Sequence, residues 1–516
     1  MARSEKAPAR GYAARGPMHR SYLLSLACLT ALACNAGKPG KRPYFTVATG
    51  GAATTAGNTG SGGEFEVEAA RPLEEVQRDY IELRFGMFIH FGILTYTGSW
   101  SQANLPIEQF DPTALDPGQW ADAAVAAKMK YAVLTTRHHD GFGLWPSAVS
   151  DFDVGSIGWQ GGKGDVVRQY VDAFRERGLL PGLYYSVWDN TQGTGNGPVT
   201  REQIEYVKAQ LSELLSNYGP IPILVFDGWS WKMGHQAMPY QEIRELVKSL
   251  QPNCLMLDHS HLMSPWDADI AAIEEPKGAF APEDNTAPAT QGQKINGSGG
   301  NDWFWAPNIG GLMSVENIVD QHLTLLEARY TNFLLNCPPN REGLLDQAIV
   351  DRLTEVGEAW SPDRERPPLP PQGPQNERPY TAVSATATSG AAENAIDGHN
   401  DWGFYTLWST AEALPQSITL DLGQEQPDVG FLGYVPRYVP NEGPSSEGAI
   451  TGYAIYTSTD NVEFTEAATG EWPADGKMKV ATFPAVAARY VRLEALASNG
   501  QDVAATEIAV GAAPQD

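Results

Sequence analysis

The chain has 516 residues, and its 36 Lys and Arg against 62 Asp and Glu give a formal net charge of −26. This charge excludes a nucleic-acid-binding protein, because phosphate recognition needs a basic face. Hydrophobic residues make up 42% of the chain and aromatic residues 10%, which is enough for a large core and excludes disorder throughout. The length predicts two or three domains, since one α/β barrel can use about 250 residues or more.

The amino-terminal residues resemble an export signal. Residues 1–20 carry five basic side chains and one acidic side chain, and an apolar run, 21–33, follows and ends in small residues. The run is too short for a mature helix across a bilayer, which needs about 20 residues. We therefore expect residues 1–34 to be a signal peptide and no transmembrane helix to remain. Its removal takes away five basic groups and one acidic group, so the charge changes from −26 to about −30.

Ala31–Cys34 resembles a bacterial lipobox, which makes Cys34 a candidate lipid anchor; ordinary signal cleavage nearby is the alternative. Residues 35–70 contain a Gly-, Thr- and Ala-rich stretch and are predicted to form a flexible tether. The expected location is periplasmic, outer-membrane lipoprotein or extracellular.

Cysteine usage is low. Two of the four cysteines lie in the signal region, so the mature fold has at most one disulfide, between Cys254 and Cys337. No CxxC or HExxH spacing occurs, so we do not expect a structural or catalytic zinc site.

From about residue 80 the chain alternates between apolar runs and helical patterns. Runs without alternation are typical of parallel strands buried on both faces, and helices between them supply the crossovers. No Gly-rich phosphate motif is present, so the pattern predicts a (β/α)8-like TIM barrel rather than a doubly wound sheet. The runs lie at 85–92, 131–136, 179–186, 222–227, 254–258, 270–275 and 330–336, and the helices at 116–130, 164–178, 201–219, 240–250, 315–329 and 347–360.

Polar residues stand where these strands end, which is where barrels form active sites. They are His90, His138, His139, Asp140, Tyr184, Asp227, Glu274 and Glu275. A carboxylate on the fourth run and one on the sixth fit the acid and nucleophile of a glycosidase. Adjacent strand residues point to opposite faces, so only one of Glu274 and Glu275 can face the barrel mouth. A loop-bracing role for Asp227, and structural or metal-binding roles for the histidines, are the alternatives.

Several motifs resemble glycoside hydrolase family 29, the α-L-fucosidases. They cover about residues 73–362 and keep their order along the chain. The motifs are RFGMFIHFG (84–92), QWADAAVAAKMKYAVLTTRHHDGFGLWPS (119–147), GDVV (164–167) with GLLPGLYYSVWD (178–189), ILVFDGWSW (223–231), WFW (303–305) and NFLLNCPPNREGLL (332–345).

The resemblance implies a retaining, exo-acting glycosidase that removes terminal α-L-fucosyl residues from glycans. Asp227 matches the nucleophile, and Glu275 is the first choice for the acid/base, with Glu274 second and Glu283 third. Residues matching those that hold or line the sugar are His90, Trp100, His138, His139, Tyr184 and Trp303. The family often has a sugar-contacting Arg between nucleophile and acid/base, whereas residues 258–270 contain none, and His259 or His261 is the expected substitute. Fucosylated glycans are therefore the expected partner, with no cofactor for catalysis.

The sequence pattern changes after a Pro-rich linker, 363–379. Short alternating segments over 380–512 predict an all-β jelly-roll sandwich. AIDG (395–398), LWST (407–410), SITLDLG (417–423), YAIYTSTDNVEF (453–464) and ARYVRLEAL (488–496) resemble the discoidin-like, factor 5/8 C-type fold, which among glycosidases is carbohydrate-binding module family 32. The catalytic barrel is then expected over 71–362.

Modules of this kind often hold one structural Ca²⁺, and the hard oxygens of Asp397, Thr406 and Glu507 suit that ion. Turn or surface roles are the alternative for each. Trp402, Phe404, Tyr405 and Arg437 are candidates for a sugar platform, and packing is the alternative. Two other functions stay open for the whole chain: a non-catalytic carbohydrate-binding or adhesion protein, and a glycosidase for another sugar.

Overall fold

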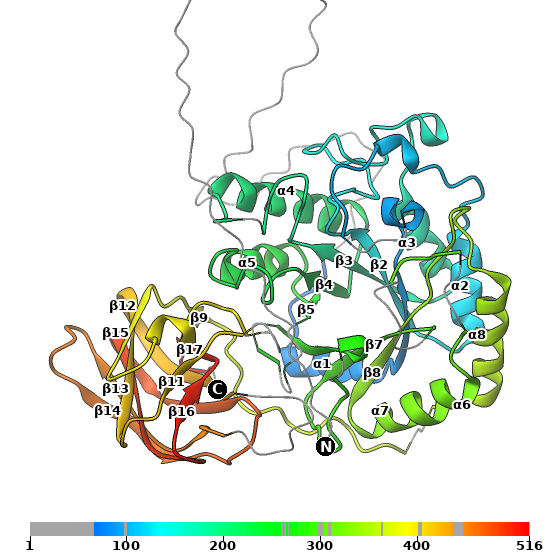
Figure 1. The fold of residues 1–516 in the computed structure, drawn as a ribbon. Helices are drawn as coiled ribbons and strands as arrows, with labels where there is room; N and C mark the ends of the chain where they lie inside the picture. The colour runs from blue at the N-terminus through cyan, green and yellow to red at the C-terminus, as the bar shows by residue number, and fades with distance from the viewer. Residues whose placement is uncertain are drawn as a thin grey trace, which may run out of the picture. The chain divides into compact units, whose positions relative to one another are not determined.

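A computed structural model describes most of the chain after the predicted tether (Figure 1). The described residues are 67–97, 101–195, 197–259, 262, 265–266, 268–277, 279–296, 303–307, 311–362, 365–400, 405–437 and 447–514. They form a parallel barrel followed by antiparallel sheets, which confirms the predicted fold class.

Eight parallel strands pair in chain order, and β1 pairs with both β2 and β8, which closes the barrel. In Figure 1 the barrel strands stand inside a ring of helices, as crossovers between parallel strands require. The strands are β1 (Phe85–Ile89), β2 (Tyr131–Arg137), β3 (Leu180–Ser186), β4 (Ile223–Asp227), β5 (Leu255–Asp258), β6 (Ile270–Glu274), β7 (Ala289–Lys294) and β8 (Thr331–Asn336).

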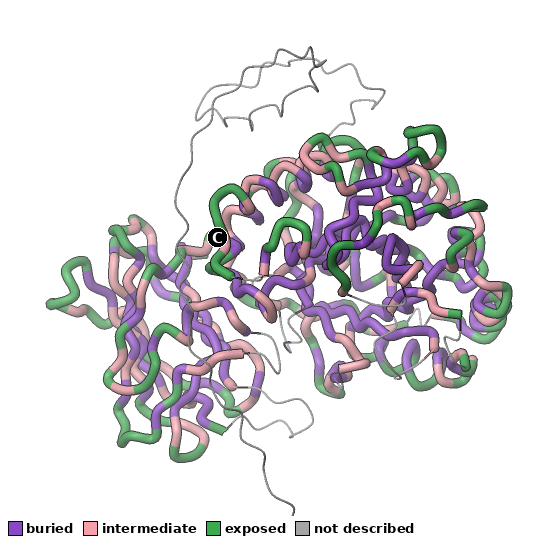
Figure 2. The backbone as a smooth tube through the Cα atoms, turned by 45° about the horizontal axis from the view of Figure 1, so that its top comes forward, coloured by how far each residue is buried: buried purple, intermediate pink, exposed green. Residues whose placement is uncertain are grey.

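Alternate strand positions face the barrel interior. Phe88, Val133, Val225, Leu257 and Ala272 come from five different strands and belong to one buried cluster. The opposite faces pack against the helices in a second, larger cluster. The barrel strands β1, β2 and β8 are buried at every residue, and Figure 2 shows buried stretches gathered in the interior of the barrel region. Strands buried on both faces explain why the sequence shows apolar runs without alternation.

Some of the helices begin at residues whose side chains cap them. Asp116 accepts hydrogen bonds from the Gly118 and Gln119 amides, and Thr200 forms a capping box with Gln203. The α-helices are α1 (Leu73–Ile81), α2 (Pro117–Ala126), α3 (Val166–Glu176), α4 (Arg201–Asn217), α5 (Tyr240–Leu250), α6 (Val315–Ile318), α7 (Thr324–Ala328) and α8 (Gln347–Ala359). The 3₁₀ turns are η1 (Ile93–Tyr96), η2 (Ile107–Gln109), η3 (Trp159–Gly161), η4 (Glu275–Lys277) and η6 (Ala392–Ala395), and η5 (Val319–Leu323) is a π-helical turn.

Three elements of the barrel region differ from the sequence prediction, and one of them is the helix α1, which was not expected. The polar strand β7 was not expected, yet all six of its residues are buried. Thr290 accepts a hydrogen bond from the Tyr80 hydroxyl at 3.0 Å, and Gln291 accepts one from the Ala281 amide at 2.9 Å. The helix expected over 315–329 is interrupted by the π-helical turn η5, which contains His322.

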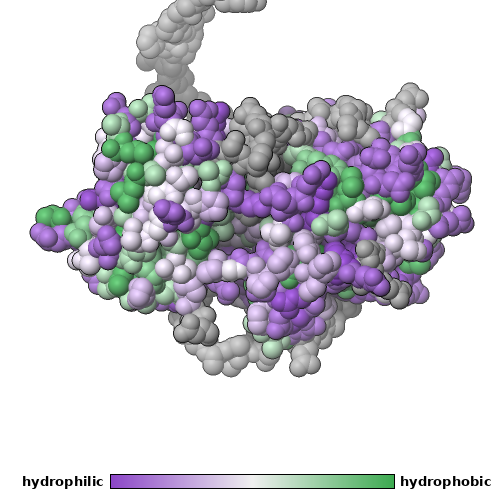
Figure 3. Space-filling view, turned by 90° about the horizontal axis from the view of Figure 1, so that it is seen from below, coloured by the Kyte–Doolittle hydropathy of each residue, from purple (hydrophilic) through white to green (hydrophobic). Residues whose placement is uncertain are grey.

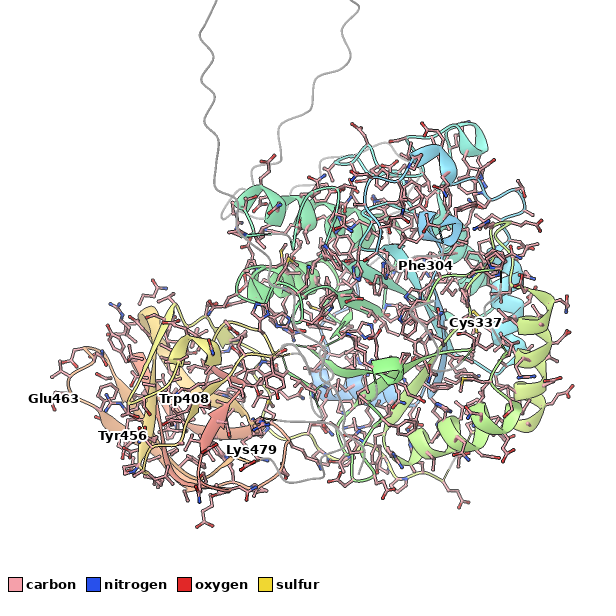
Figure 4. The ribbon with its side chains drawn as sticks, viewed as in Figure 1. Phe304, Cys337, Trp408, Tyr456, Glu463 and Lys479 are labelled. Carbon is pink, nitrogen blue, oxygen red and sulfur yellow. The ribbon has the colours of Figure 1, made fainter. Side chains whose placement is uncertain are left out.

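The carboxyl-terminal region is built from antiparallel sheets. A seven-stranded sheet has the order β14-β13-β15-β12-β17-β9, with β10 on β12, and β11 pairs with β16. Trp408 lies inside this region (Figure 4), is fully buried and donates its indole N–H to the Ser389 carbonyl at 2.9 Å. The strands are β9 (Pro379–Tyr380), β10 (Ser384–Ala387), β11 (Trp408–Thr410), β12 (Gln416–Val435), β13 (Ile450–Ser458), β14 (Thr465–Glu471), β15 (Lys479–Ser498), β16 (Val503–Ala505) and β17 (Glu507–Ala512).

Cys254 and Cys337 are both free and buried. Cys254 directly precedes β5 and Cys337, labelled in Figure 4, directly follows β8, so the two lie at opposite ends of the barrel. The one disulfide that the cysteine count allowed is therefore not formed. Burial raises the pKa of the Cys254 thiol to about 12, so it stays protonated at neutral pH.

In the part of the chain that the structure describes, no helix combines the length and apolar character needed to cross a membrane. On the face that Figure 3 presents, hydrophobic residues are scattered among hydrophilic ones. The exposed large apolar side chains are likewise spread along the chain, as at Val125, Leu180 and Val462.

Candidate active site

The carboxyl ends of the strands bring the predicted polar residues together. The Tyr184 hydroxyl on β3 lies 2.7 Å from Asp227 Oδ2 at the end of β4. His139 Nε2, after β2, lies 3.7 Å from the same oxygen. The rings of His90, after β1, and His138 have centroids 5.7 Å apart. Side chains from four strand ends thus meet at one opening of the barrel, as the barrel topology requires.

Asp227 is oriented by hydrogen bonds to both carboxylate oxygens. Oδ2 accepts the Tyr184 hydroxyl, while Oδ1 accepts the Trp231 indole N–H at 2.8 Å and the Gly228 amide at 2.5 Å. Burial alone would raise the pKa of Asp227, but three histidines and one lysine outweigh it and lower the pKa below its ordinary value. These four neighbours are His139, His259, His138 and Lys277. Asp227 is therefore an ionised, fixed carboxylate at neutral pH.

His139 is held in one tautomer by its neighbours. The Ser186 hydroxyl donates to the Trp188 carbonyl at 2.7 Å, so Ser186 Oγ accepts the proton of His139 Nδ1 at 2.7 Å. Burial lowers the pKa of His139 to about 4, against the opposing effect of Asp227. The ring is therefore neutral at neutral pH, and its Nε2 lone pair faces the side of the site that holds Asp227.

His90 is fixed in the same way from the other side of the site. Asn336 donates its amide N–H to the Trp303 carbonyl at 2.7 Å, so its Oδ1 accepts the proton of His90 Nδ1 at 2.8 Å. Burial lowers the pKa of His90 to about 3, so this ring is also neutral. Both histidines present Nε2 as a hydrogen-bond acceptor, which suits sugar hydroxyls.

Aromatic rings line the space around these polar groups. His138 stacks on Tyr184 at 5.4 Å with an 8° interplanar angle, and Trp303 stacks on His90 at 5.0 Å. The edges of His90 and His138 meet Phe304, at centroid distances of 5.4 and 5.1 Å. Phe304 is labelled within the barrel region in Figure 4. The site thus combines hydrogen-bond acceptors with apolar faces, the composition of a sugar pocket.

The two candidate acid/base glutamates, Glu274 and Glu275, point to different sides of β6. Ile270 and Ala272 of β6 belong to the barrel-interior cluster, so strand alternation directs Glu274, two residues further, to the interior side. The Glu274 charge acts on His90, His139 and Tyr184. Its carboxylate also lies 3.3 Å from Lys277.

Glu275 belongs to the turn η4 and bonds away from these residues. Its Oε2 accepts hydrogen bonds from Gln291 Nε2 at 2.9 Å and from His322 Nε2 at 2.8 Å. Burial would raise the pKa of Glu275, but the hydrogen bond and charge of His322, together with hydrogen bonds from Gln291 and Gln293, outweigh it and lower the pKa. The geometry therefore favours Glu274, the second choice from sequence, over Glu275 as the carboxyl group facing Asp227.

The structure adds residues that sequence reasoning missed or left open. His259, one of two expected substitutes for the absent Arg, is buried and acts electrostatically on Asp227. Trp188 stacks on His139 at 4.4 Å, and Trp231 bonds to Asp227. Asn336 and Ser186 set the histidine tautomers. Asn336 and Ser186 end β8 and β3, so their positions at strand ends were a usable signal.

Other expected residues lie elsewhere. Trp100 and His261 lie outside the described residues, as do Trp402, Phe404 and Cys34. Glu283, the third choice for the acid/base, has a 92% exposed side chain and lies 3.8 Å from Arg329. Glu283 thus lies at the protein surface and is not part of the site.

One group of site residues could also hold a metal ion. The ligand atoms of His138, His139 and Asp227 lie within 4.8 Å of one another. Neutral imidazoles and a carboxylate are ligands that zinc accepts. These atoms border the same space as the sugar pocket, so a metal ion and a sugar would compete for it.

The predicted calcium ligands of the carboxyl-terminal region also lie close together. The Thr406 hydroxyl lies 2.7 Å from Asp397 Oδ2 and 3.2 Å from the Asn394 carbonyl oxygen. Glu507, which is buried, accepts the Gly398 amide at 3.1 Å, next to Asp397. Hydroxyl, carbonyl and carboxylate oxygens fit the preference of Ca²⁺, so the donor chemistry agrees with the predicted site.

Comparison with known proteins identifies the family. The family profile described as alpha-L-fucosidase matches residues 63–362, more than half of the chain, and the profile described as F5/8 type C domain matches residues 379–508. The chain belongs to the α-L-fucosidase family, glycoside hydrolase family 29. The resemblance predicted from the sequence motifs, for the barrel and for the discoidin-like domain, is confirmed.

The relatives match this chain over part of their length. Alpha-L-fucosidase 1 of Arabidopsis thaliana is 32% identical over 294 residues, which is 53% of this chain and 57% of the relative. Tissue alpha-L-fucosidase of Rattus norvegicus is 26% identical over 431 residues, 73% of this chain and 88% of the relative. The chain thus spans a little over half the length of the plant relatives it matches.

Solved structures of the family are also similar. One is a family 29 fucosidase from Ruminococcus gnavus, solved in complex with fucose. It is 18% identical and covers 89% of this chain and 97% of its own, with a TM-score of 0.47.

Proposed function

We propose that the protein is an exo-acting α-L-fucosidase that hydrolyses terminal α-L-fucosyl residues of glycans by a retaining, double-displacement mechanism. The observation that carries the proposal is the Asp227 carboxylate, fixed by three hydrogen bonds and kept ionised at the carboxyl end of β4. It stands in a pocket of neutral histidines, in a chain of the α-L-fucosidase family.

In the first step, Asp227 attacks the anomeric carbon, and the bond from that carbon to the leaving oxygen breaks. We propose Glu274, rather than Glu275, as the group that gives its proton to the leaving oxygen. The side of β6 that carries Glu274 supports this choice, as does its action on His139 and Tyr184. The products are a fucosyl-enzyme ester on Asp227 and the free aglycone.

In the second step, Glu274 takes a proton from water, and the resulting oxygen attacks the anomeric carbon and releases Asp227. Two displacements restore the original anomeric configuration. Lys277, 3.3 Å from Glu274, attracts the ionised form that acts as base, whereas the negative charge of Asp227 favours the protonated form that acts as acid.

The neighbouring residues support the proposal of a deoxy sugar as substrate. His90 and His139 each offer an Nε2 acceptor for a sugar hydroxyl, because their Nδ1 protons are already bound. The rings of Trp303 and Phe304 offer apolar area for sugar C–H groups and for the methyl group of fucose. Exo action on a terminal fucosyl residue follows for this proposal from the family to which the chain belongs.

The experiment is hydrolysis of a panel of nitrophenyl glycosides by the full chain and by Asp227→Asn. We expect turnover of the α-L-fucoside above all others, and a loss of about a thousandfold or more in the variant. Near wild-type turnover in Asp227→Asn would remove the assigned nucleophile. Absence of fucoside turnover by the wild type would leave the non-catalytic carbohydrate-binding alternative.

For the rest of the chain we propose export by the amino-terminal signal and a carbohydrate-binding role for the discoidin-like domain with one structural Ca²⁺. Asp397, Thr406 and Glu507 would hold the ion, which would brace the loops around it. Mass spectrometry of the mature amino terminus tests lipidation at Cys34, and glycan binding by the full chain and a chain ending before residue 380 tests the domain.

A further inference from the structure

A strip of lysine and tryptophan side chains borders the proposed catalytic carboxylates. The Lys232 ammonium lies 4.4 Å from the centroid of the Trp188 ring, and the Lys277 ammonium lies 5.3 Å from that of Trp231. The two indoles meet edge to face at 5.6 Å. We call these four residues the lysine–tryptophan rim. Each cation sits on an aromatic face, an attractive arrangement that also fixes its position.

The rim touches the catalytic groups directly. The Trp231 indole donates to Asp227 Oδ1 at 2.8 Å, and Trp188 stacks on His139 at 4.4 Å. Lys277 contributes to lowering the pKa of both Asp227 and His139. The rim therefore borders the reaction centre.

The rim lies on the side of the leaving group. An acid/base must contact the oxygen between the fucosyl residue and the next sugar. Lys277 contacts Glu274 at 3.3 Å, so it stands beside that next sugar. Of the residues that would hold fucose itself, His139 contacts the rim through Trp188, whereas His90 and Trp303 lie after other strands.

Lys232 has no counterion nearby among the described residues. Among the residues that the structure describes, no carboxylate lies within ion-pair distance of Lys232, and its ammonium packs on Trp188 alone. Gly195 has a positive φ of 89°, and a Cβ there would lie 2.9 Å from Trp188 and 3.2 Å from the Lys232 stem. The loop thus packs closely against this lysine and holds it in place.

The positive charge of Lys232 and Lys277 stands beside a site and in a chain that are otherwise acidic. The whole chain carries −26, and Asp227 and Glu274 add two carboxylates at the site. An anionic glycan would be repelled by these charges, and two lysines at the leaving-group side offset the two carboxylates locally. A neutral aglycone could accept hydrogen bonds from the ammonium groups but would form no ion pair with them.

We propose that the lysine–tryptophan rim is a leaving-group subsite for an anionic sugar, so that the enzyme prefers fucosylated glycans whose neighbouring sugar carries a sulfate ester or a carboxylate. The indoles would pack on the face of that sugar, and Lys232 and Lys277 would pair with its anion. This inference rests on the proposed function, because it needs Glu274 and Asp227 to define the leaving-group side.

The test compares three fucosyl disaccharides of one linkage, whose second sugar is neutral, sulfated or a uronate. Competition in one mixture gives the ratio of kcat/KM for each anionic substrate over the neutral one. For the wild type we expect a ratio of about ten for at least one anion, equivalent to about 1.4 kcal/mol. The ratio should fall as salt is raised. The two anionic arms distinguish sulfate from carboxylate.

Lys232→Ala should bring the ratio close to one, while Lys232→Arg should keep most of it because the charge remains. Lys163→Ala, an exposed lysine in the loop after β2, is the matched control and should keep the wild-type ratio. Melting temperatures of the three variants check that each is folded.

A wild-type ratio of one or less overturns the proposal, and so does an unchanged ratio in Lys232→Ala. If none of the three disaccharides nor a nitrophenyl fucoside is hydrolysed, the proposed function fails instead. If the neutral disaccharide is hydrolysed without any anion preference, only the rim proposal fails.

Discussion

Replacement of each adjacent glutamate by glutamine separates their roles. Glu274→Gln removes the proton donor but keeps the shape of the side chain. For a fucoside with an alcohol leaving group, loss of general acid catalysis lowers kcat/KM by about 10²- to 10⁴-fold. This corresponds to about 3 to 5 kcal/mol of transition-state stabilisation. A nitrophenyl leaving group needs less protonation, so the loss with that substrate should be smaller.

Glu275→Gln should behave differently, because its carboxylate bonds to Gln291 and His322. Both bonds end on the same oxygen, Oε2, and an amide oxygen in that place can still accept hydrogen bonds from Gln291 Nε2 and from His322 Nε2, while His322 Nδ1 bonds to the Asn317 carbonyl. The ion pair is lost, so we expect a stability cost of about 1 to 3 kcal/mol and turnover within about threefold of wild type.

The assay is kcat/KM for both fucosides with each variant, together with azide rescue. Azide should restore turnover of Glu274→Gln with retained anomeric configuration, because azide attacks the fucosyl-enzyme. The reasoning is refuted if Glu275→Gln loses a hundredfold or more while Glu274→Gln stays near wild type. That outcome would restore Glu275 as the acid/base.

Three further predictions concern other parts of the structure. Tyr184→Phe removes a hydrogen bond to the Asp227 carboxylate and should lower kcat/KM about 10- to 150-fold. The control is Tyr185→Phe, which removes a hydroxyl that bonds to Gln210 and should change kcat/KM about threefold at most. Equal losses in the two variants would contradict a role of Tyr184 in orienting Asp227. Burial lowers the pKa of His90 to about 3 and of His139 to about 4, so the unfolded chain takes up protons that the folded barrel does not as pH falls below about 6.5. The free energy of unfolding, measured by urea titration, should therefore fall between about pH 6.5 and pH 4, by on the order of 3 kcal/mol for His139 alone. His139→Gln should flatten this dependence, and the same slope in wild type and variant would contradict it. Removal of Ca²⁺ with a chelator should lower the melting temperature of the carboxyl-terminal domain. Ca²⁺ at about 100 times its Kd should restore about 2.7 kcal/mol of unfolding free energy. A melting temperature that responds to neither would contradict the predicted site of Asp397, Thr406 and Glu507.

Much of the barrel was predictable because seven of its strands are apolar runs. The remaining strand, β7, was not, since its residues are Ala-Thr-Gln-Gly-Gln-Lys and read as a polar loop. Its polar groups are buried because partners distant in sequence satisfy them, such as Tyr80 on Thr290. These hydrogen bonds form only in the closed barrel, so no local sequence pattern predicts the burial of this polar strand.

The site residues at strand ends were predictable from the barrel topology, but the orientation of each side chain was not. Strand alternation predicted that only one of Glu274 and Glu275 faces the mouth. The run Ile-Ala-Ala-Ile is apolar on both faces, so the sequence could not decide which of the two it is. The membership of Ile270 and Ala272 in the interior cluster makes that choice.

The lysine–tryptophan rim was also invisible in the sequence. Lys232 and Lys277 are separated by 44 residues, and a lone lysine in a loop has no pattern. Trp188 and Trp231 were part of quoted motifs, yet their contact with each other depends on the adjacency of β3 and β4. Contacts between loops of neighbouring strands appear only once the strand order is known.

The central claim is that Asp227 forms a covalent bond with the sugar. A fluorinated fucosyl fluoride, whose fluorine beside the anomeric carbon slows the second displacement, should trap that ester. Peptide mass spectrometry of the full chain should then find one fucosyl label, on Asp227, and none in Asp227→Asn. A label on another residue, or no label under conditions in which fucosides are hydrolysed, would contradict the account.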